Sequence, residues 1–118
     1  VRQVGPVPLI LAHMGGWRNW AQVEALLPET NVYLDTAFSL GDITPLGDGY
    51  YGPSDLPLLR EAQFVRMVHT FGARRVLFGT DSPWTGQREE LARLRALPLT
   101  REELDDILGE NARRLLSL

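Results

Sequence analysis

The chain has 118 residues, enough for one ordinary domain, and its 44% hydrophobic and 23% charged residues are typical of a globular protein. A net charge of −3 and a pI near 5.3 argue against a nucleic-acid partner, which would require a basic face. No apolar run approaches the roughly 20 residues of a membrane span and no secretory leader is recognisable, so we expect no membrane partner and, by elimination, a cytoplasmic location. The sequence contains neither cysteine nor lysine, which excludes disulfides, thiolate chemistry, lysine Schiff bases and carbamylated-lysine metal bridges within this chain.

The first predicted strand is short and ends in a histidine. Residues 1–8 are typical of a connector because they contain one glycine and two prolines. Residues 9–12 form a continuous apolar run that predicts a buried strand, and His13 follows directly, before a methionine and two glycines. Residues 17–27 then repeat apolar side chains at spacings of three and four, which predicts a helix that Pro28 ends.

The second predicted strand, residues 31–38, has an apolar body and carries Asp35 near its end. The segment 39–57 that follows contains four glycines and three prolines, so we expect no regular structure there. Irregular loops of this length in compact domains are usually functional lids or are disordered. Tyr50 and Tyr51 within this segment either offer a stacking surface to a ligand or anchor the loop by burial.

The third predicted strand leads to an aspartate. Residues 58–71 predict an amphipathic helix, in which His69 lies beside the apolar stripe and is assigned no chemistry. Residues 75–78 form a short apolar run rich in strand-forming residues, after which the chain changes abruptly to Gly, Thr, Asp81, Ser and Pro. A buried strand that delivers a carboxylate at its C-terminal end is how α/β folds place a reactive group.

Two further helices complete the predicted element order. Residues 87–97 carry an apolar seam of leucines, and a last helix begins at Arg101, where Thr100 and Glu103 form a capping box. Strands that alternate with helices are typical of a parallel sheet joined by right-handed crossovers. We therefore predict an α/β fold with three parallel strands, flanking helices and a C-terminal helix.

Each predicted strand ends in a polar side chain: His13, Asp35 and Asp81. Because the C-terminal ends of parallel strands share one edge of a sheet, we expect these three to converge in space. A neutral imidazole can bind a divalent metal or take a proton from water, and a carboxylate is a hard oxygen donor suited to zinc. The sequence predicts a metal-assisted site in which His13 and Asp81 carry the chemistry.

Structural alternatives apply to each of these residues. His13 alone could be a core histidine bonded to a carbonyl, and Asp81 could cap the following helix. Asp35 could orient an imidazole or a substrate hydroxyl, or simply bond the backbone at the strand end. Trp84, with the two tyrosines, hints at an aromatic or planar small-molecule ligand.

Four segments occur in the order found in a known family: Pro8-Leu-Ile-Leu-Ala-His-Met-Gly-Gly16, Asn31-Val-Tyr-Leu-Asp-Thr36, Val76-Leu-Phe-Gly-Thr-Asp-Ser-Pro83 and Asn111-Ala-Arg-Arg-Leu-Leu116. Together they resemble the amidohydrolase-related (amidohydrolase 2) family, which contains metal-dependent hydrolases and aminocarboxymuconate-semialdehyde-type decarboxylases. The resemblance implies that residues 1–118 are the C-terminal part of a TIM barrel, strands six to eight.

The resemblance also implies roles for single residues. His13 would be the strand-six histidine that polarises or deprotonates the attacking water or grips the substrate. Asp81 would be the strand-eight metal ligand and proton acceptor. The metal would be divalent, zinc first with manganese or iron as alternatives, and the reaction would be hydrolysis of a small molecule, with decarboxylation as the alternative.

The family's opening His-x-His pair and its strand-five histidine have no counterpart, because this chain has only two histidines. Two ligands cannot hold zinc firmly, so we expect this chain alone to be inactive and its metal position to be able to stand unfilled. Three strands leave open sheet edges. The chain is therefore expected to be a fragment, to pair with the remainder of the barrel, or to self-associate as a homo-oligomer; a non-catalytic half-barrel that serves oligomerisation or binding is the alternative outside enzymology.

Overall fold

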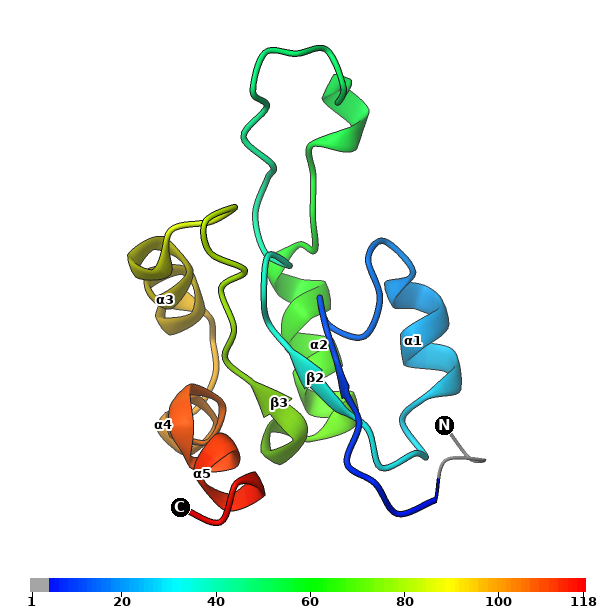
Figure 1. Cartoon of the computed structure of the whole chain (residues 1–118), viewed down its shortest axis with the longest axis vertical. Helices are drawn as coiled ribbons and strands as arrows, with labels where there is room; N and C mark the ends of the chain where they lie inside the picture. The colour runs from blue at the N-terminus through cyan, green and yellow to red at the C-terminus, as the bar shows by residue number, and fades with distance from the viewer. Residues whose placement is uncertain (1–4) are drawn as a thin grey trace.

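A computed structural model describes residues 5–118, so the first four residues of the predicted connector lie outside the described residues. The chain forms three short strands and five α-helices, with 3-10 turns at Pro53–Asp55 and Ala73–Arg75 and a π turn at Asp106–Glu110 (Figure 1). The order is β1 Ile10–Leu11, α1 Trp20–Leu26, β2 Tyr33–Asp35, α2 Glu61–Phe71, β3 Val76–Leu77, α3 Gln87–Ala96, α4 Arg101–Asp105 and α5 Asn111–Leu115.

The three strands form one parallel sheet in the order β1-β2-β3, which confirms the predicted α/β class. Ile10 pairs with Tyr33, and Leu34 pairs with Val76. All three strands are shorter than predicted. At β3 the 3-10 turn Ala73–Arg75 occupies the start of the predicted strand, and the amide of Phe78 donates to the Ile107 carbonyl (3.0 Å) and not to a neighbouring strand, so the ladder ends at Leu77.

The core lies between the sheet and the helix α2. Phe64 of that helix is fully buried, as are Leu34 of the central strand β2 and Val76 of β3. Figure 1 shows α2 crossing behind β2, with α1 beside the sheet and α4 and α5 near β3. Beyond β1, no further strand pairs with the sheet among the described residues, and Ile10 is 50% exposed there. The buried core therefore covers one face of the sheet, whereas the β1 edge is open. This is expected for three strands that do not close a barrel.

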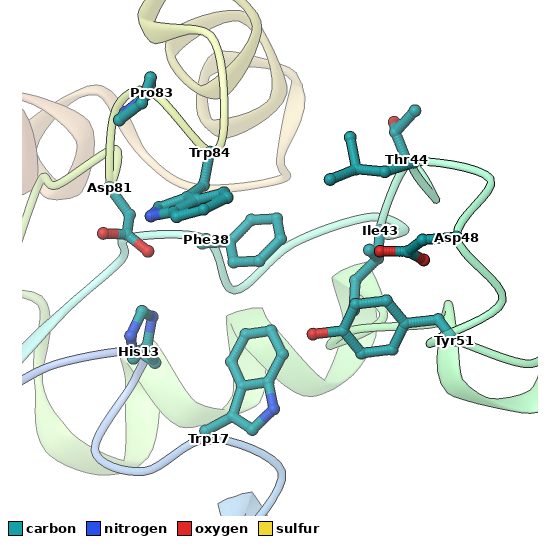
Figure 2. A pocket seen from close by; sticks show the side chains of 11 residues that line it. His13, Trp17, Phe38, Ile43, Thr44, Asp48, Tyr51, Asp81, Pro83 and Trp84 are labelled. Carbon is teal, nitrogen blue, oxygen red and sulfur yellow. The ribbon is translucent and has the colours of Figure 1, made fainter.

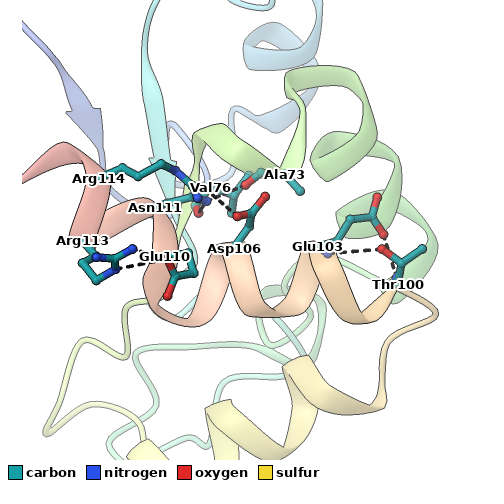
Figure 3. Close-up of polar contacts among 9 residues, drawn as sticks. All are labelled: Ala73, Val76, Thr100, Glu103, Asp106, Glu110, Asn111, Arg113 and Arg114. Carbon is teal, nitrogen blue, oxygen red and sulfur yellow. Dashed lines mark hydrogen bonds and ion pairs between the residues drawn. The ribbon is translucent and has the colours of Figure 1, made fainter.

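Two helix boundaries differ from the prediction for identifiable reasons. The first helix begins at Trp20 and not at residue 17, because Arg18 adopts a left-handed φ of 61°. Helix α2 begins at Glu61 and not at residue 58, because Leu58 and Leu59 donate backbone hydrogen bonds to the opposite side of the preceding loop (2.9 and 3.0 Å). The predicted cap of the last helix is confirmed (Figure 3).

The segment 39–57 forms an arm that projects from the body in Figure 1. The expectation of no regular structure is wrong at its base. There Leu40 bridges Leu59, and the amide of Ile43 donates to the Leu56 carbonyl (2.7 Å). A 3-10 turn at Pro53–Asp55 follows the tip. The arm thus consists of an outgoing and a returning segment joined by backbone hydrogen bonds. The local glycine and proline content does not predict this pairing.

The C-terminal helices are tied to β3 by a buried amide. Asn111, 2% exposed, donates from Nδ2 to the carbonyls of Ala73 and Val76 (both 2.7 Å), and its Oδ1 accepts from Arg114 (2.5 Å; Figure 3). Arg114 also pairs with Asp106. This arrangement gives the Asn-Ala-x-x-Leu-Leu segment a packing role at the start of the strand. Among residues 5–118, no helix combines the length and apolar character that crossing a membrane demands.

Candidate active site

A pocket of about 610 Å³ lies where the three strands end (Figure 2). His13, Asp81, Tyr51 and Trp84 all line it, so segments far apart in the sequence meet there. Of the other candidates, Asp35 and Tyr50 do not line the pocket; Tyr50 is 78% exposed and packs edge-on against Tyr51. The remaining lining residues are Trp17, Phe38, Ile43, Thr44, Leu46, Asp48 and Pro83.

The tautomer of His13 follows from its ring contact. Its Nδ1 lies 2.9 Å from the carbonyl oxygen of Ala37. A carbonyl can only accept, so in the neutral ring Nδ1 carries the hydrogen and Nε2 holds the free lone pair. His13 is thus bonded to a carbonyl, as the structural alternative predicted, but only through Nδ1. Its Nε2 remains available to a metal, a proton or a substrate.

Asp35 joins the ends of β1 and β2 from outside the pocket. Its Oδ1 accepts from the backbone N–H of Ala37 (2.9 Å) and, more distantly, from that of His13 (3.3 Å). These are the side-chain-to-backbone bonds of the structural alternative, and one of them holds the candidate histidine. The Asp35 carboxylate therefore contacts the backbone of His13 and not its ring, which is hydrogen-bonded to Ala37.

Asp81 sits in a turn after β3 with its side chain in the pocket (Figure 2). Its carbonyl accepts from the backbone N–H of Trp84 (2.9 Å). The helix-cap alternative is wrong, because α3 begins only at Gln87, after Gly86, and no side chain caps it. Within residues 5–118 no group donates a hydrogen bond to the Asp81 carboxylate, so this anion faces the pocket and solvent.

The turn that carries Asp81 is fixed to β2 by a threonine. The Thr36 hydroxyl, in a residue 4% exposed, donates to the Gly79 carbonyl and accepts from the Gly79 N–H (both 3.1 Å). A Cβ on Gly79 would lie 3.2 Å from the Cβ of Ala37, so a larger residue would have to push the two strand ends apart by a few tenths of an ångström. The end of β2 therefore contacts both neighbouring segments, one through Asp35 and the other through Thr36.

All three strand ends contain a left-handed residue that is not glycine. The φ angles are 55° at His13, 44° at Phe38 and 55° at Asp81. Such conformations cost of order 1–3 kcal/mol each and persist only where surrounding contacts enforce them. Their position at one edge of the sheet, around one pocket, is typical of a functional site.

Trp17 and Phe38 form an aromatic wall beside the histidine, which the sequence pattern did not predict. Trp17 stacks on Phe38 with ring centroids 5.3 Å apart, and it meets His13 edge-on at 5.4 Å. The sequence signal was the Gly15-Gly16 pair directly after His13. Gly15 has a φ of 93°, a left-handed conformation that favours glycine, in the turn that leads from His13 to Trp17.

The donor set fits part of a metal site. Nε2 of His13 and the Asp81 carboxylate are both suitable ligands for zinc or manganese. Residues 5–118 contain no group of three or more His, Cys, Asp or Glu side chains that could hold an ion. A complete site would need donors from outside this set. The pocket lining otherwise carries one more carboxylate, Asp48, and no arginine.

The chain is similar to known proteins in family and in fold. The model of the amidohydrolase family Amidohydro_2 matches residues 5–118. No curated protein matches the chain. A dihydroxybenzoic acid decarboxylase from Polaromonas sp., solved with manganese and the inhibitor 2-nitroresorcinol, is 20% identical with a TM-score of 0.59, over 92% of this chain and 33% of that one.

Two further solved structures are similar. One, described as a candidate 2-pyrone-4,6-dicarboxylic acid hydrolase from Pseudomonas putida, is 16% identical with a TM-score of 0.63, over 98% of this chain and 45% of that one. The other is an amidohydrolase from Burkholderia multivorans with bound zinc, 21% identical with a TM-score of 0.61, over 93% and 44%. The chain thus spans less than half the length of these structures, and the likeness shows a shared fold. The match of the family model over residues 5–118 shows that the chain belongs to the amidohydrolase 2 family.

Proposed function

We propose that residues 1–118 form one C-terminal segment of a (β/α)8 barrel, with β1, β2 and β3 as strands six, seven and eight. The proposal is supported by the parallel order β1-β2-β3, by the final helix that closes on β3, and by the share of similar structures that the chain covers. In such barrels the reacting groups lie at the C-terminal ends of the strands, which is where His13 and Asp81 lie.

The function we infer is the catalytic C-terminal part of a metal-dependent hydrolase. The observation that carries it is the shared pocket in which His13 offers a free Nε2 and Asp81 an unbonded carboxylate. A divalent metal, zinc first and manganese or iron as alternatives, supplies Lewis acidity when it is bound by Asp81 and by ligands from the rest of the barrel. Asp81 would then accept a proton from the attacking water, and His13, once protonated on Nε2, would donate that N–H to the substrate oxygen on which negative charge develops.

Decarboxylation is the second candidate, and the aromatic wall favours it. Trp17 and Phe38 present a flat apolar surface next to His13, as a ring-bearing substrate requires. The Polaromonas structure is a decarboxylase of a dihydroxybenzoic acid. In this reaction Asp81 or His13 first takes up a proton from water and then delivers it to the ring carbon, whose bond to the carboxylate breaks with release of CO2.

The substrate we propose is a small molecule with an aromatic or planar part. Tyr51 and Trp84 line the pocket, and Tyr50 supports Tyr51 from the exposed side. No arginine lines the pocket in the described residues, so this chain is suited to contact a ring, with any acidic group of the substrate bound by the metal or by other strands.

We further propose that the chain is inactive by itself and works with the remainder of the barrel or, in its absence, with a second copy of itself. A half-barrel without a metal, serving only oligomerisation or binding, is the alternative. Metal analysis after dialysis separates the two for the complete protein. A stoichiometric divalent metal supports the enzyme, and its absence supports the binding module.

Substitutions of His13 and Asp81, measured in the protein with the complete barrel, test the roles of these two residues. His13→Ala and Asp81→Asn should each lower kcat by several powers of ten, as loss of general-base and metal-ligand roles typically does. His69→Ala is the matched histidine control, since His69 is exposed and pairs with Glu103. Asp42→Asn is the matched aspartate control, because Asp42 pairs with a surface arginine outside the pocket. Normal turnover in either test variant would remove the assignment.

A further inference from the structure

His13 is held by a buried tryptophan that does not line the pocket. Trp20 is the first residue of α1, and its side chain is largely buried (8% exposed). Its indole Nε1–H donates to the backbone carbonyl of His13 (2.9 Å). The same carbonyl also accepts from the amide of Gly16, over a longer distance (3.3 Å). The indole bond is thus the shorter contact to the His13 carbonyl.

Three separate groups therefore fix one residue. The backbone N–H of His13 contacts Asp35, its carbonyl accepts from Trp20, and its ring Nδ1 donates to Ala37. This matters because His13 has left the sheet and adopts a φ of 55°, which a residue with a Cβ does not hold without support. A shift of the main chain at this point would move the ring away from the Ala37 carbonyl.

We propose that Trp20 is a positioning residue for His13. Its N–H holds the His13 carbonyl, so the imidazole keeps its bond from Nδ1–H to Ala37 and presents Nε2 to the pocket. The role in catalysis rests on the proposed function of His13, whereas the role in fixing the tautomer does not.

Packing alone does not account for an indole at this position. The ring of Trp20 lies 6.4 Å from that of Trp17 and joins the same core as Val23, and phenylalanine would fill most of that space. What phenylalanine lacks is the N–H donor. Trp20→Phe therefore separates the hydrogen bond from the packing.

Nitrogen NMR of the 118-residue chain tests the inference without any activity. Because His13 and His69 are the only histidines, their ring signals are readily told apart. We expect the wild-type His13 to be almost entirely in the tautomer with hydrogen on Nδ1, and Trp20→Phe to shift it to a mixture, while exposed His69 is unchanged. Trp84→Phe is the control, because Trp84 gives no hydrogen bond to His13. A Trp20→Phe chain that keeps the Nδ1–H tautomer would overturn the proposal.

A second measurement uses only the wild-type chain, so it tests the proposal even if the Trp20→Phe variant does not fold. The bonded indole N–H of Trp20 should exchange with solvent at least about 100-fold more slowly than that of Trp84, which is 70% exposed. Equal exchange rates would also overturn the proposal. In the completed enzyme, Trp20→Phe should lower kcat by about 10-fold with little change in KM, within the range reported for groups that orient a reacting residue. If the wild-type enzyme shows no activity, the proposed function fails, but the tautomer result still stands.

Discussion

Replacing Thr36 by valine tests whether the end of β2 fixes the turn that carries Asp81. Valine has nearly the same shape as threonine, so the change opens no cavity at this site, which is 4% exposed. It removes one hydroxyl, and with it both 3.1 Å hydrogen bonds to the main chain of Gly79. The Gly79 N–H and carbonyl are then left without these partners.

The expected cost follows from those two bonds. A hydrogen bond contributes about 0.5–1.5 kcal/mol net, and a buried group left unpaired costs about 1–3 kcal/mol. We therefore expect Thr36→Val to lower the free energy of unfolding by about 2 kcal/mol. With a urea m-value of about 1–3 kcal/mol/M for a small domain, the midpoint should fall by about 1 M.

Urea unfolding of the 118-residue chain, followed by tryptophan fluorescence and by circular dichroism, measures the change. Thr70→Val is the matched control, since Thr70 is exposed on α2 and threonine and valine have similar helix propensities. The control should stay within about 0.5 kcal/mol of the wild type. If Thr36→Val also stays within that range, the hydroxyl does not hold the turn, and the reasoning about the Asp81 segment is refuted.

Three further outcomes are expected. Asn111→Ala should destabilise the chain by about 3 kcal/mol in the same assay, because it removes two hydrogen bonds and leaves the Val76 carbonyl at the start of β3 without its Asn111 partner. Thr100→Ala should cost about 1 kcal/mol through loss of the helix cap, in which the Thr100 N–H also holds the pKa of Glu103 below its usual value. Burial raises the pKa of Glu90 despite its ion pair with Arg93 (2.8 Å), so its stabilising contribution is present at low pH and is lost as pH rises through the folded-state pKa. Glu90→Gln should therefore gain stability relative to the wild type as pH rises above the ordinary pKa of a glutamate, about 4.3.

Each of these has a contrary result. Asn111→Ala with an unchanged midpoint would mean that the final helix is not anchored to β3 by the amide. Thr100→Ala without a loss would mean that the cap is not formed in solution. A Glu90→Gln chain whose stability relative to wild type falls with rising pH would mean that the ion pair with Arg93 outweighs the cost of burying the carboxylate.

The sequence determined the order and type of the elements because these depend on local patterns. Apolar runs, helical spacing and the Thr100–Glu103 box act over a few residues and were confirmed by the sheet and by the cap. Strand lengths were wrong, because the end of a ladder depends on backbone contacts between segments, as at Phe78, whose amide donates to the Ile107 carbonyl. Arg18, with its left-handed φ, moved the start of the first helix from residue 17 to Trp20.

The sequence also determined which residue types stand at the strand ends, since His13 directly follows one apolar run and Asp81 lies three residues after another. Only the tertiary structure decided that Nδ1 of His13 is bonded and Nε2 is free, that Asp35 acts through the backbone, and that Trp17 forms a wall beside the ring. The physical reason is that a tautomer, a hydrogen-bond partner and a stacked ring each depend on atoms brought together from different segments. Spacing along the chain carries no information about those distances.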